Sequence, residues 1–96
     1  MTHTELVKKL NEKEAVIGVV GLGYVGLPLI LEYADKNFKS IGFDIDSKKI
    51  DFIERGESYI KHIPSEKIAK VVNNGMFTST TDFSRLAEVD AILVAV

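Results

Sequence analysis

The chain has 96 residues, of which 12 are basic and 14 are acidic, so its formal net charge is −2. Hydrophobic residues make up 46% and charged residues 27%, which excludes an intrinsically disordered chain and is ordinary for one globular domain. The absence of cysteine excludes a disulfide scaffold, a zinc–thiolate site and a cysteine nucleophile within these residues. The mildly acidic balance provides no attraction to nucleic acid or to an anionic membrane, so we expect neither as a partner.

The first 14 residues predict a short helical extension rather than a targeting signal. Thr2 and Glu5 have the spacing of a capping box, and Leu6, Val7 and Leu10 form one apolar stripe of a helix. Charged residues interrupt the segment throughout, so it lacks the apolar centre of a secretory signal. We therefore expect residues 1–14 to pack as an appendage on the main domain of a cytoplasmic protein.

The stretch from Ala15 to Leu31 carries no charge over 17 residues. As a single helix it would span about 26 Å, less than the roughly 30 Å of a membrane's hydrocarbon core. Several glycines and Pro28 also interrupt it, so we predict a buried strand, a glycine turn and a buried helix in succession. Residues 15–20 are apolar on both faces and rich in β-branched side chains, which is typical of a central parallel strand.

A helix and a second strand follow the glycines. Leu27, Ile30, Leu31 and Ala34 recur at helical spacing, and such a stripe indicates one buried helix face. Residues 39–44 read as the second strand, which ends in a carboxylate.

Helix caps and glycine stops mark the next elements. Asp46 or Ser47 can cap the second helix, which Gly56 ends, and Ser65 is expected to cap a third helix, which Gly75 ends. The remaining pattern predicts a short strand, a short helix and a second fully buried strand, over residues 76–80, 83–87 and 90–96.

This alternation of strands and helices predicts the fold class. It favours an α/β fold in which parallel strands are joined by right-handed crossovers and covered by helices on both faces. We expect residues 15–96 to form a Rossmann-like, doubly wound parallel sheet of about four strands. Because the chain stops inside an apolar strand, we expect it to be the truncated N-terminal portion of a larger domain.

The run from Gly21 to Gly26 matches G-x-G-x-x-G between a predicted strand and a predicted helix. In such a turn Gly21 permits the tight bend, Gly23 lets a pyrophosphate approach the backbone, and Gly26 lets the helix pack closely on the strand. The amides of Tyr24 and Val25 would point at the phosphates from the helix N-terminus. The alternative is a glycine turn that serves packing alone.

Asp44 lies 18 residues beyond the last glycine of the turn, near the spacing expected for a carboxylate that binds the adenosine ribose. Its charge would repel a 2′-phosphate, so the sequence favours NAD over NADP as the cofactor. The alternative is that Asp44 caps a helix, although Asp46 and Ser47 are better placed for that task. Lys48 and Lys49 follow closely, and either could meet a 2′-phosphate.

No other residue shows a clear chemical pattern. His3 and His62 have no partner at metal-ligand or catalytic spacing, so we interpret His62 as an exposed loop histidine and predict no metal site. Tyr59 is either an anchor for its loop or a substrate contact, and we favour the anchor. No nucleophile–base pair is recognisable, so we assign no catalytic residue.

Several runs make the sequence similar to the UDP-glucose/GDP-mannose dehydrogenase family. The Gly-Tyr-Val-Gly-Leu-Pro run is far more specific than the glycine pattern alone. The resemblance covers nearly all of residues 15–96 and rests on the segments 17–28, 42–46, 49–50, 80–83 and 90–96.

The resemblance implies an NAD-dependent enzyme that oxidises C6 of a nucleotide sugar from alcohol to carboxylate, with two hydride transfers that consume two NAD. It implies that Asp44 binds the ribose and that Lys49 is the family's basic residue beside it. The same resemblance implies that the pyrophosphate is bound by Gly21, Gly23, Tyr24, Val25 and Gly26. The family's catalytic cysteine, lysine and asparagine and its sugar-nucleotide domain would lie beyond residue 96, so we expect the chain by itself to be inactive.

The sequence of one loop indicates the substrate class. Members that act on UDP-glucose often have a Glu-Pro-Gly-Leu stretch after the second helix, whereas this chain has Ser58 to Pro64 there. That loop is similar to members that act on UDP-N-acetylhexosamines in bacterial surface-polysaccharide synthesis. The small-molecule partner expected from the resemblance is therefore a nucleotide sugar, a UDP-hexose or a UDP-N-acetylhexosamine.

A different class of protein shares the first strand, the glycine turn and the ribose carboxylate. It is the non-catalytic nucleotide-sensing Rossmann domain that regulates a transporter, and we keep it as the alternative function. The apolar final strand also predicts edge-to-edge pairing with another copy, so a homo-oligomer is a further expected partner.

Overall fold

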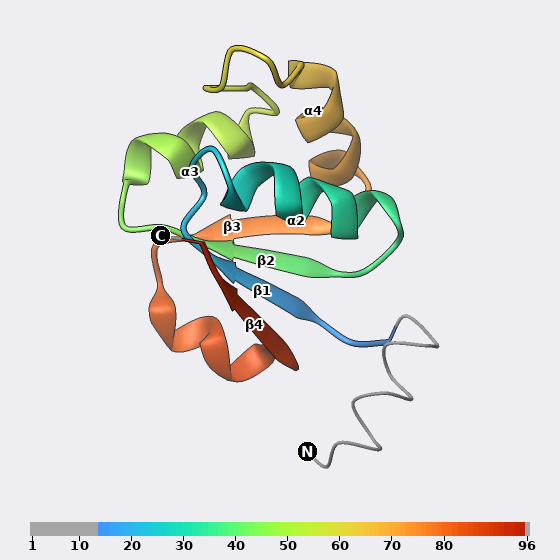
Figure 1. Ribbon diagram of the computed structural model, residues 1–96, viewed down its shortest axis with the longest axis vertical. Coiled ribbons are helices and arrows are strands. Elements are labelled where there is room, and N and C mark those ends of the chain that lie inside the picture. The colour runs from blue at the N-terminus through green and yellow to red at the C-terminus, as the bar shows by residue number, and fades with distance from the viewer. Residues whose placement is uncertain (1–13, 96) are drawn as a thin grey trace.

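The computed structural model describes residues 14–95 (Figure 1). The helical extension expected over residues 1–14 falls almost wholly outside these described residues. Within them, four strands alternate with three α-helices and one 3₁₀-helix. In chain order the elements are β1 (Ile17–Val20), α2 (Gly26–Asp35), β2 (Ser40–Phe43), α3 (Ser47–Glu54), α4 (Ser65–Asn73), β3 (Phe77–Thr80), the 3₁₀-helix η1 (Phe83–Glu88) and β4 (Ala91–Val94).

The four strands form one parallel sheet in the order β3-β2-β1-β4. Helices α2, α3 and α4 lie on one face and η1 on the other (Figure 1), so the predicted Rossmann-like, doubly wound fold is confirmed. The strand order reverses at β1, which has β2 on one side and β4 on the other. In open parallel sheets such a reversal opens a crevice at the carboxyl ends of the strands, and ligands bind there.

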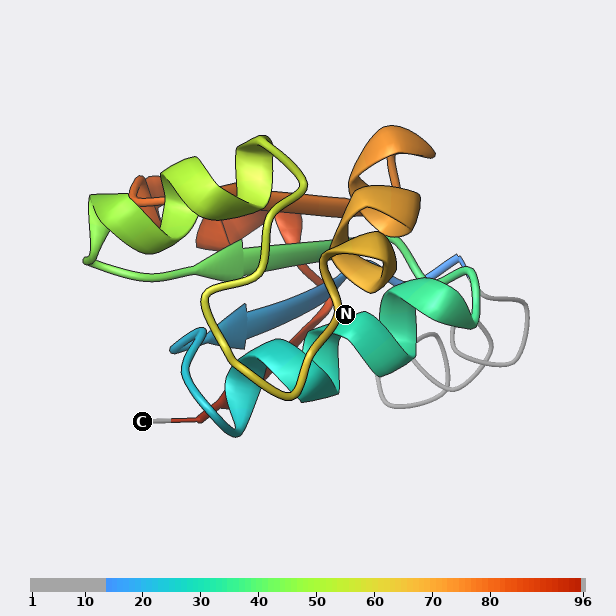
Figure 2. The ribbon, with the colours of Figure 1, turned by 90° about the horizontal axis from the view of Figure 1, so that it is seen from above.

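The core lies between the sheet and the three α-helices. Ile17 and Val19 of β1 point into it, and Leu27 and Ile30 of α2 are fully buried against them. The apolar stripe predicted for α2 is therefore confirmed as its buried face. Figure 2 shows the turn before α2 and the end of β4 at the same end of the sheet, which is the end where β2 leads into α3.

The uncharged stretch from Ala15 to Leu31 folds as predicted into β1, a turn and the first part of α2. Among residues 14–95, no helix has the length and apolar character needed to cross a membrane.

The N-terminus of α4 differs from the sequence expectation. Pro64, in extended conformation, occupies the N-cap position and makes no side-chain cap, so the prediction that Ser65 caps this helix was wrong. The Ser65 hydroxyl instead accepts a hydrogen bond at 3.0 Å from the backbone N–H of Ser58. Its oxygen therefore secures the start of the preceding loop rather than the first turn of the helix.

The prediction that the last strand is fully buried was also wrong. Ile92 and Val94 are 50% and 67% exposed, whereas Ala91 and Leu93 are partly buried. Ile92 pairs with Gly18 in register and lies on the same face of the sheet as η1. Phe83 of η1 packs on Phe43 of β2, and Val89, which follows η1, lies against Gly18 of β1, so the edge strand β4 stays uncovered on this face.

Candidate functional site: a glycine turn beside a strand-end carboxylate

Each of the three glycines in the turn after β1 meets a different spatial demand. Gly21 has a φ of 94°, a conformation that L side chains rarely adopt, and its N–H donates to the Phe43 carbonyl at 2.8 Å. A Cβ on Gly26 would lie 1.6 Å from the carbonyl oxygen of Gly21, so only glycine allows α2 to start so close to β1. A Cβ on Gly23 would meet nothing within 4 Å, so the turn is open to solvent there.

The residues that start α2 present polar backbone to this open space. Tyr24 and Val25 are 74% and 67% exposed, and Val25 occupies the N-cap of α2 without a side-chain cap. Within residues 14–95, the N–H groups of Gly23, Tyr24 and Val25 donate no hydrogen bond to the chain. Free amides at a helix N-terminus attract anions, and the helix dipole contributes about 0.3–2 kcal/mol to that attraction.

Asp44 connects the end of β2 to the turn. It is only 8% exposed, and its Oδ2 accepts a hydrogen bond at 2.8 Å from the N–H of Leu22, between the first two glycines. Its Oδ1 accepts from the N–H of Asp46 at 2.9 Å. Asp46 itself caps α3 by accepting from the N–H of Lys48, so Asp44 is not the helix cap.

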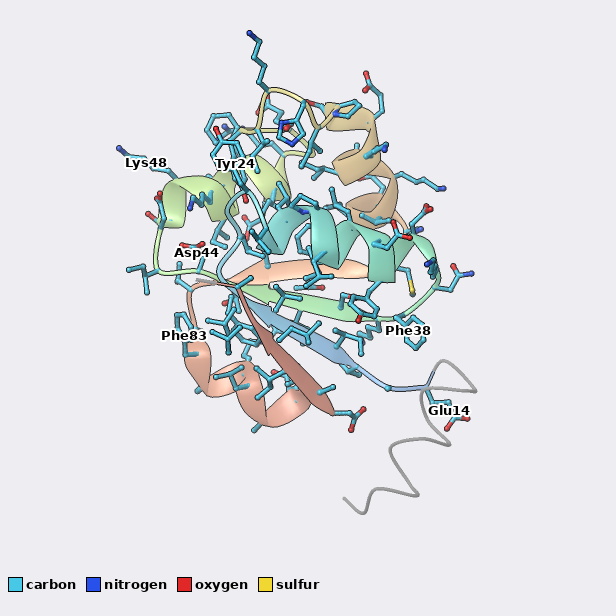
Figure 3. All side chains as sticks on the ribbon, viewed as in Figure 1. Glu14, Tyr24, Phe38, Asp44, Lys48 and Phe83 are labelled. Atoms are coloured by element: carbon cyan, nitrogen blue, oxygen red, sulfur yellow. The ribbon has the colours of Figure 1, made fainter. Side chains whose placement is uncertain are left out.

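The charge of Asp44 is stabilised in place. Burial raises the pKa of Asp44, but the hydrogen bonds from the Leu22 and Asp46 amides and the charge of Lys49 outweigh it, so the pKa lies below its ordinary value of 3.8. The Lys49 ammonium lies 3.7 Å from Oδ2, whereas Lys48 is exposed. In Figure 3, Asp44 lies at the same end of the molecule as Tyr24 and Lys48.

The loop between α3 and α4 covers one side of the turn, which the sequence only partly indicated. The Tyr59 hydroxyl donates to the Leu22 carbonyl, so the interpretation of Tyr59 as an anchor is confirmed. The ring of His62 stacks on that of Tyr24, with centroids 6.1 Å apart and an interplanar angle of 20°. The sequence offered no sign of this stacking, because the two residues are brought together only by the path of the loop.

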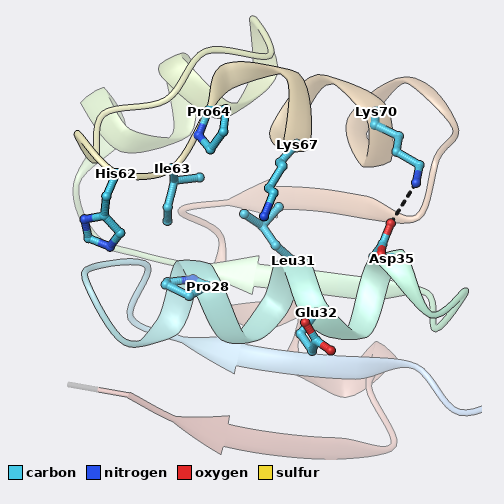
Figure 4. A pocket seen from close by; sticks show the side chains of 9 residues that line it. All are labelled: Pro28, Leu31, Glu32, Asp35, His62, Ile63, Pro64, Lys67 and Lys70. Carbon is cyan, nitrogen blue, oxygen red and sulfur yellow. Dashed lines mark hydrogen bonds and ion pairs between the residues drawn. The ribbon is translucent and has the colours of Figure 1, made fainter.

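A separate cavity of about 400 Å³ lies on the outer side of α2 (Figure 4). It is bounded by α2, by α4 and by residues 62–64, the end of the loop between α3 and α4. Acidic and basic side chains both line it, including Asp35, which pairs with Lys70 at 2.8 Å. None of the seven residues expected to contact a cofactor lines it. Among residues 14–95, no cluster of three or more His, Asp or Glu side chains is placed to hold a metal ion.

The sequence matches the UDP-glucose/GDP-mannose dehydrogenase family, NAD binding domain, over residues 15–96. The chain belongs to this family. The matched segment contains the whole sheet, the glycine turn and Asp44. It is therefore an NAD binding domain of the nucleotide-sugar dehydrogenase type, and the expected cofactor, NAD, is that of the family domain.

Relatives and solved structures agree with this assignment. The chain is 39% identical over 84 residues to the UDP-N-acetyl-D-mannosamine dehydrogenase of Escherichia coli (strain K12), covering 85% of this chain and 19% of that protein. It superposes on the GDP-mannose dehydrogenase of Pseudomonas aeruginosa with a TM-score of 0.78 and 30% identity, over 83% of this chain and 19% of that one. An NDP-N-acetyl-D-galactosaminuronic acid dehydrogenase from Methanosarcina mazei Go1 gives a TM-score of 0.78 and 40% identity, over 95% and 22%.

The chain thus spans about a fifth of the length of the UDP-N-acetyl-D-mannosamine dehydrogenases that it matches. The family model, this curated relative and these two solved structures are all of dehydrogenases, and they favour the dehydrogenase interpretation over the nucleotide-sensing alternative.

Proposed function

We propose that this family domain binds NAD with its pyrophosphate on the turn after β1 and its adenosine ribose on Asp44. The observation that supports this most directly is the hydrogen bond that the Leu22 amide of the turn donates to the Asp44 carboxylate. It puts a buried, ionised carboxylate beside the open amides of the turn. The proposed contacts are Gly21, Gly23, Tyr24, Val25 and Gly26 for the pyrophosphate, Asp44 for the ribose hydroxyls and Lys49 beside them.

The residues present fit a dinucleotide. The open space at Gly23 lets phosphate oxygens approach the backbone, and the unpartnered amides supply donors for them. Each carboxylate oxygen of Asp44 accepts one hydrogen bond from the backbone, and each can still accept another from a ribose hydroxyl. The same negative charge disfavours a 2′-phosphate, so NAD is the preferred dinucleotide.

We further propose that the domain works in an enzyme that oxidises C6 of a UDP-sugar from alcohol to carboxylate. That change removes four electrons as two hydrides, which two NAD accept when bound, and water supplies the second carboxylate oxygen. The names of the relatives and the loop from Ser58 to Pro64 both favour a UDP-N-acetylhexosamine as the substrate class. The 96 residues contain no cysteine, and we expect no turnover from them alone.

Other parts of the sequence interpretation stay predictions. They are the division into an extension over residues 1–14 and a domain over 15–96, the homo-oligomer, the cytoplasmic location, and the lack of a nucleic-acid or membrane partner.

NADH titration of the 96-residue chain, followed by NMR chemical shifts, tests the proposed site. We expect binding nearer millimolar than micromolar, or roughly −4 to −8 kcal/mol. Asp44→Ala removes hydrogen bonds to a charged group, which are worth about 1.5–3 kcal/mol, so NADH affinity should fall by about ten- to a hundredfold. The matched control is Asp82→Ala, which removes a carboxylate that caps η1 at the end of the next strand, β3.

The control should bind NADH as the wild type does. Equal binding by the wild type and Asp44→Ala would refute the ribose role, and shifts confined to the cavity outside α2 would refute the proposed site altogether.

A further inference from the structure

Leu22, between the first two glycines of the turn, is held from several sides. Its side chain is fully buried and fills the space that Gly42 of β2 leaves, because a Cβ on Gly42 would lie 2.8 Å from Leu22 Cδ2. Its N–H donates to Asp44 at 2.8 Å, and its carbonyl accepts from the Tyr59 hydroxyl. The turn is therefore attached to β2 through Leu22 and to the loop before α4 through Tyr59.

The bond from Tyr59 has a consequence for the neighbouring glycine. The Leu22 carbonyl and the Gly23 N–H belong to one planar, trans peptide unit, so the two groups point in opposite directions. When Tyr59 holds the carbonyl, it also holds the Gly23 N–H pointing away from the loop. Within residues 14–95 the Gly23 N–H donates no hydrogen bond, and a Cβ on Gly23 would meet no atom within 4 Å, so this amide has no partner in the chain and the turn beside it is open.

Tyr59 is itself well placed to keep this bond. Its ring packs edge-on against Phe52 of α3, with centroids 6.1 Å apart and an interplanar angle of 66°. Burial, and then the negative charges of Asp44 and Asp46, raise the pKa of the Tyr59 hydroxyl above its ordinary value of 10.0. The hydroxyl therefore stays protonated, as a donor to a carbonyl must.

We propose that Tyr59 is a positioning residue for the dinucleotide: through the Leu22 carbonyl it presets the Gly23 amide to receive a phosphate oxygen. The proposal rests on the proposed function, because it assumes that the turn binds the pyrophosphate of NAD. Tyr59 does not touch the cofactor. It reduces the ordering that the turn must undergo when the cofactor binds, and pre-organisation of this kind raises affinity.

The test compares Tyr59→Phe with Tyr33→Phe. Tyr59→Phe keeps the ring that packs on Phe52 and removes only the hydroxyl. Tyr33, near the C-terminal end of α2, is the matched control, because it is also partly buried and packs edge-on against a phenylalanine, Phe38, at 6.0 Å and 85°. Two quantities are measured by NMR in each protein: the affinity for NADH, and the hydrogen-exchange rate of the Leu22 amide, which is bonded to Asp44.

We expect Tyr59→Phe to bind NADH about two- to tenfold more weakly, as the loss of one neutral hydrogen bond implies. The Leu22 amide should exchange faster, while amides within β1 and β2 exchange as in the wild type, which a general loss of stability would not produce. Tyr33→Phe should match the wild type in both measurements.

Unchanged NADH affinity in Tyr59→Phe would overturn the inference, and so would weaker binding with unchanged exchange at the Leu22 amide. No NADH binding by the wild type would instead overturn the proposed function on which the inference rests. If Tyr59→Phe fails to fold, hydrogen exchange in the wild type tests whether the turn is held in place. Exchange at Leu22 at least about tenfold slower than at the exposed Tyr24 supports the hold on the turn, and equal rates overturn it.

Discussion

Adding one methyl group at Gly26 should destabilise the domain strongly. Alanine is normally the better residue in a helix by about 1 kcal/mol, and Gly26 is the first residue of α2. Here the new Cβ would lie 1.6 Å from the carbonyl oxygen of Gly21, whereas real Cβ contacts are essentially never under 3.0 Å. The helix and strand would have to separate by about 1.4 Å or more, and both are backbone, so no side chain can rotate away.

Forced separation of packed backbone falls at or above the upper end of the overpacking range of about 1–3 kcal/mol. We therefore expect Gly26→Ala to lower the free energy of unfolding by about 3 kcal/mol or more. For a chain of this size that corresponds to a fall in Tm of about 12–24 °C. The total stability of such a domain is roughly 5–15 kcal/mol, so the variant should remain only marginally folded.

Gly23→Ala is the matched control, since it adds the same methyl group three residues away. Nothing lies within 4 Å of the added Cβ, and Gly23 is not among the glycines with positive φ. Its stability should stay within about 1 kcal/mol of the wild type, with a small gain from the stiffer unfolded chain. Its NADH affinity should nevertheless fall at least about tenfold, because the methyl group occupies the space proposed for the pyrophosphate.

Urea denaturation followed by circular dichroism measures the first effect, and NADH titration measures the second. The reasoning is refuted if Gly26→Ala unfolds at the wild-type urea concentration, or if Gly23→Ala binds NADH as the wild type does. Together the two variants separate the packing role of the turn from its binding role.

The remaining predictions concern Asp44 and its neighbour Lys49. The wild type should bind NAD more tightly than NADP, and Asp44→Asn should reduce that preference by about tenfold, since a like-charge repulsion at close range is worth roughly 1–4 kcal/mol. Competition titrations measure the ratio of the two affinities, and an unchanged ratio in Asp44→Asn would contradict the prediction. Because the pKa of Asp44 is lowered by folding, its ionised form adds stability that is fully present above pH 3.8 and lost as the pH falls through the folded-state value. The stabilities of wild type and Asp44→Asn, from urea unfolding at stepped pH, should therefore converge in acid, and a constant difference would show that the charge plays no part. Lys49→Met should raise the pKa of Asp44, measured by carboxyl NMR titration, yet change stability by less than about 1 kcal/mol, because the Lys49 side chain is one-third exposed.

Local rules of the sequence predicted most of the fold. The apolar segments, the glycine after β1 and the Asp46 cap each depend on residues within a few positions, so their outcome could be worked out before the structure. The tight bend predicted at Gly21 is local in the same way, and the structure gives this residue a positive φ. The burial of β4 depended instead on which element covers its face, and there the prediction was wrong for Ile92 and Val94.

The candidate site divides in the same way. The spacing of Asp44 from the glycine turn placed it at the tip of a neighbouring strand, because consecutive parallel strands bring their carboxyl ends to one edge of the sheet. The sequence could not show that its carboxylate binds the Leu22 amide, that Tyr59 holds the other side of the same residue, or that His62 stacks on Tyr24. These contacts join residues 22 to 38 positions apart, and only the packing of α3 and its loop against the turn brings them together. Periodicity and spacing therefore determined the elements and the kind of ligand, whereas the tertiary structure decided which side chains hold the turn, because contacts between distant residues depend on how whole elements pack.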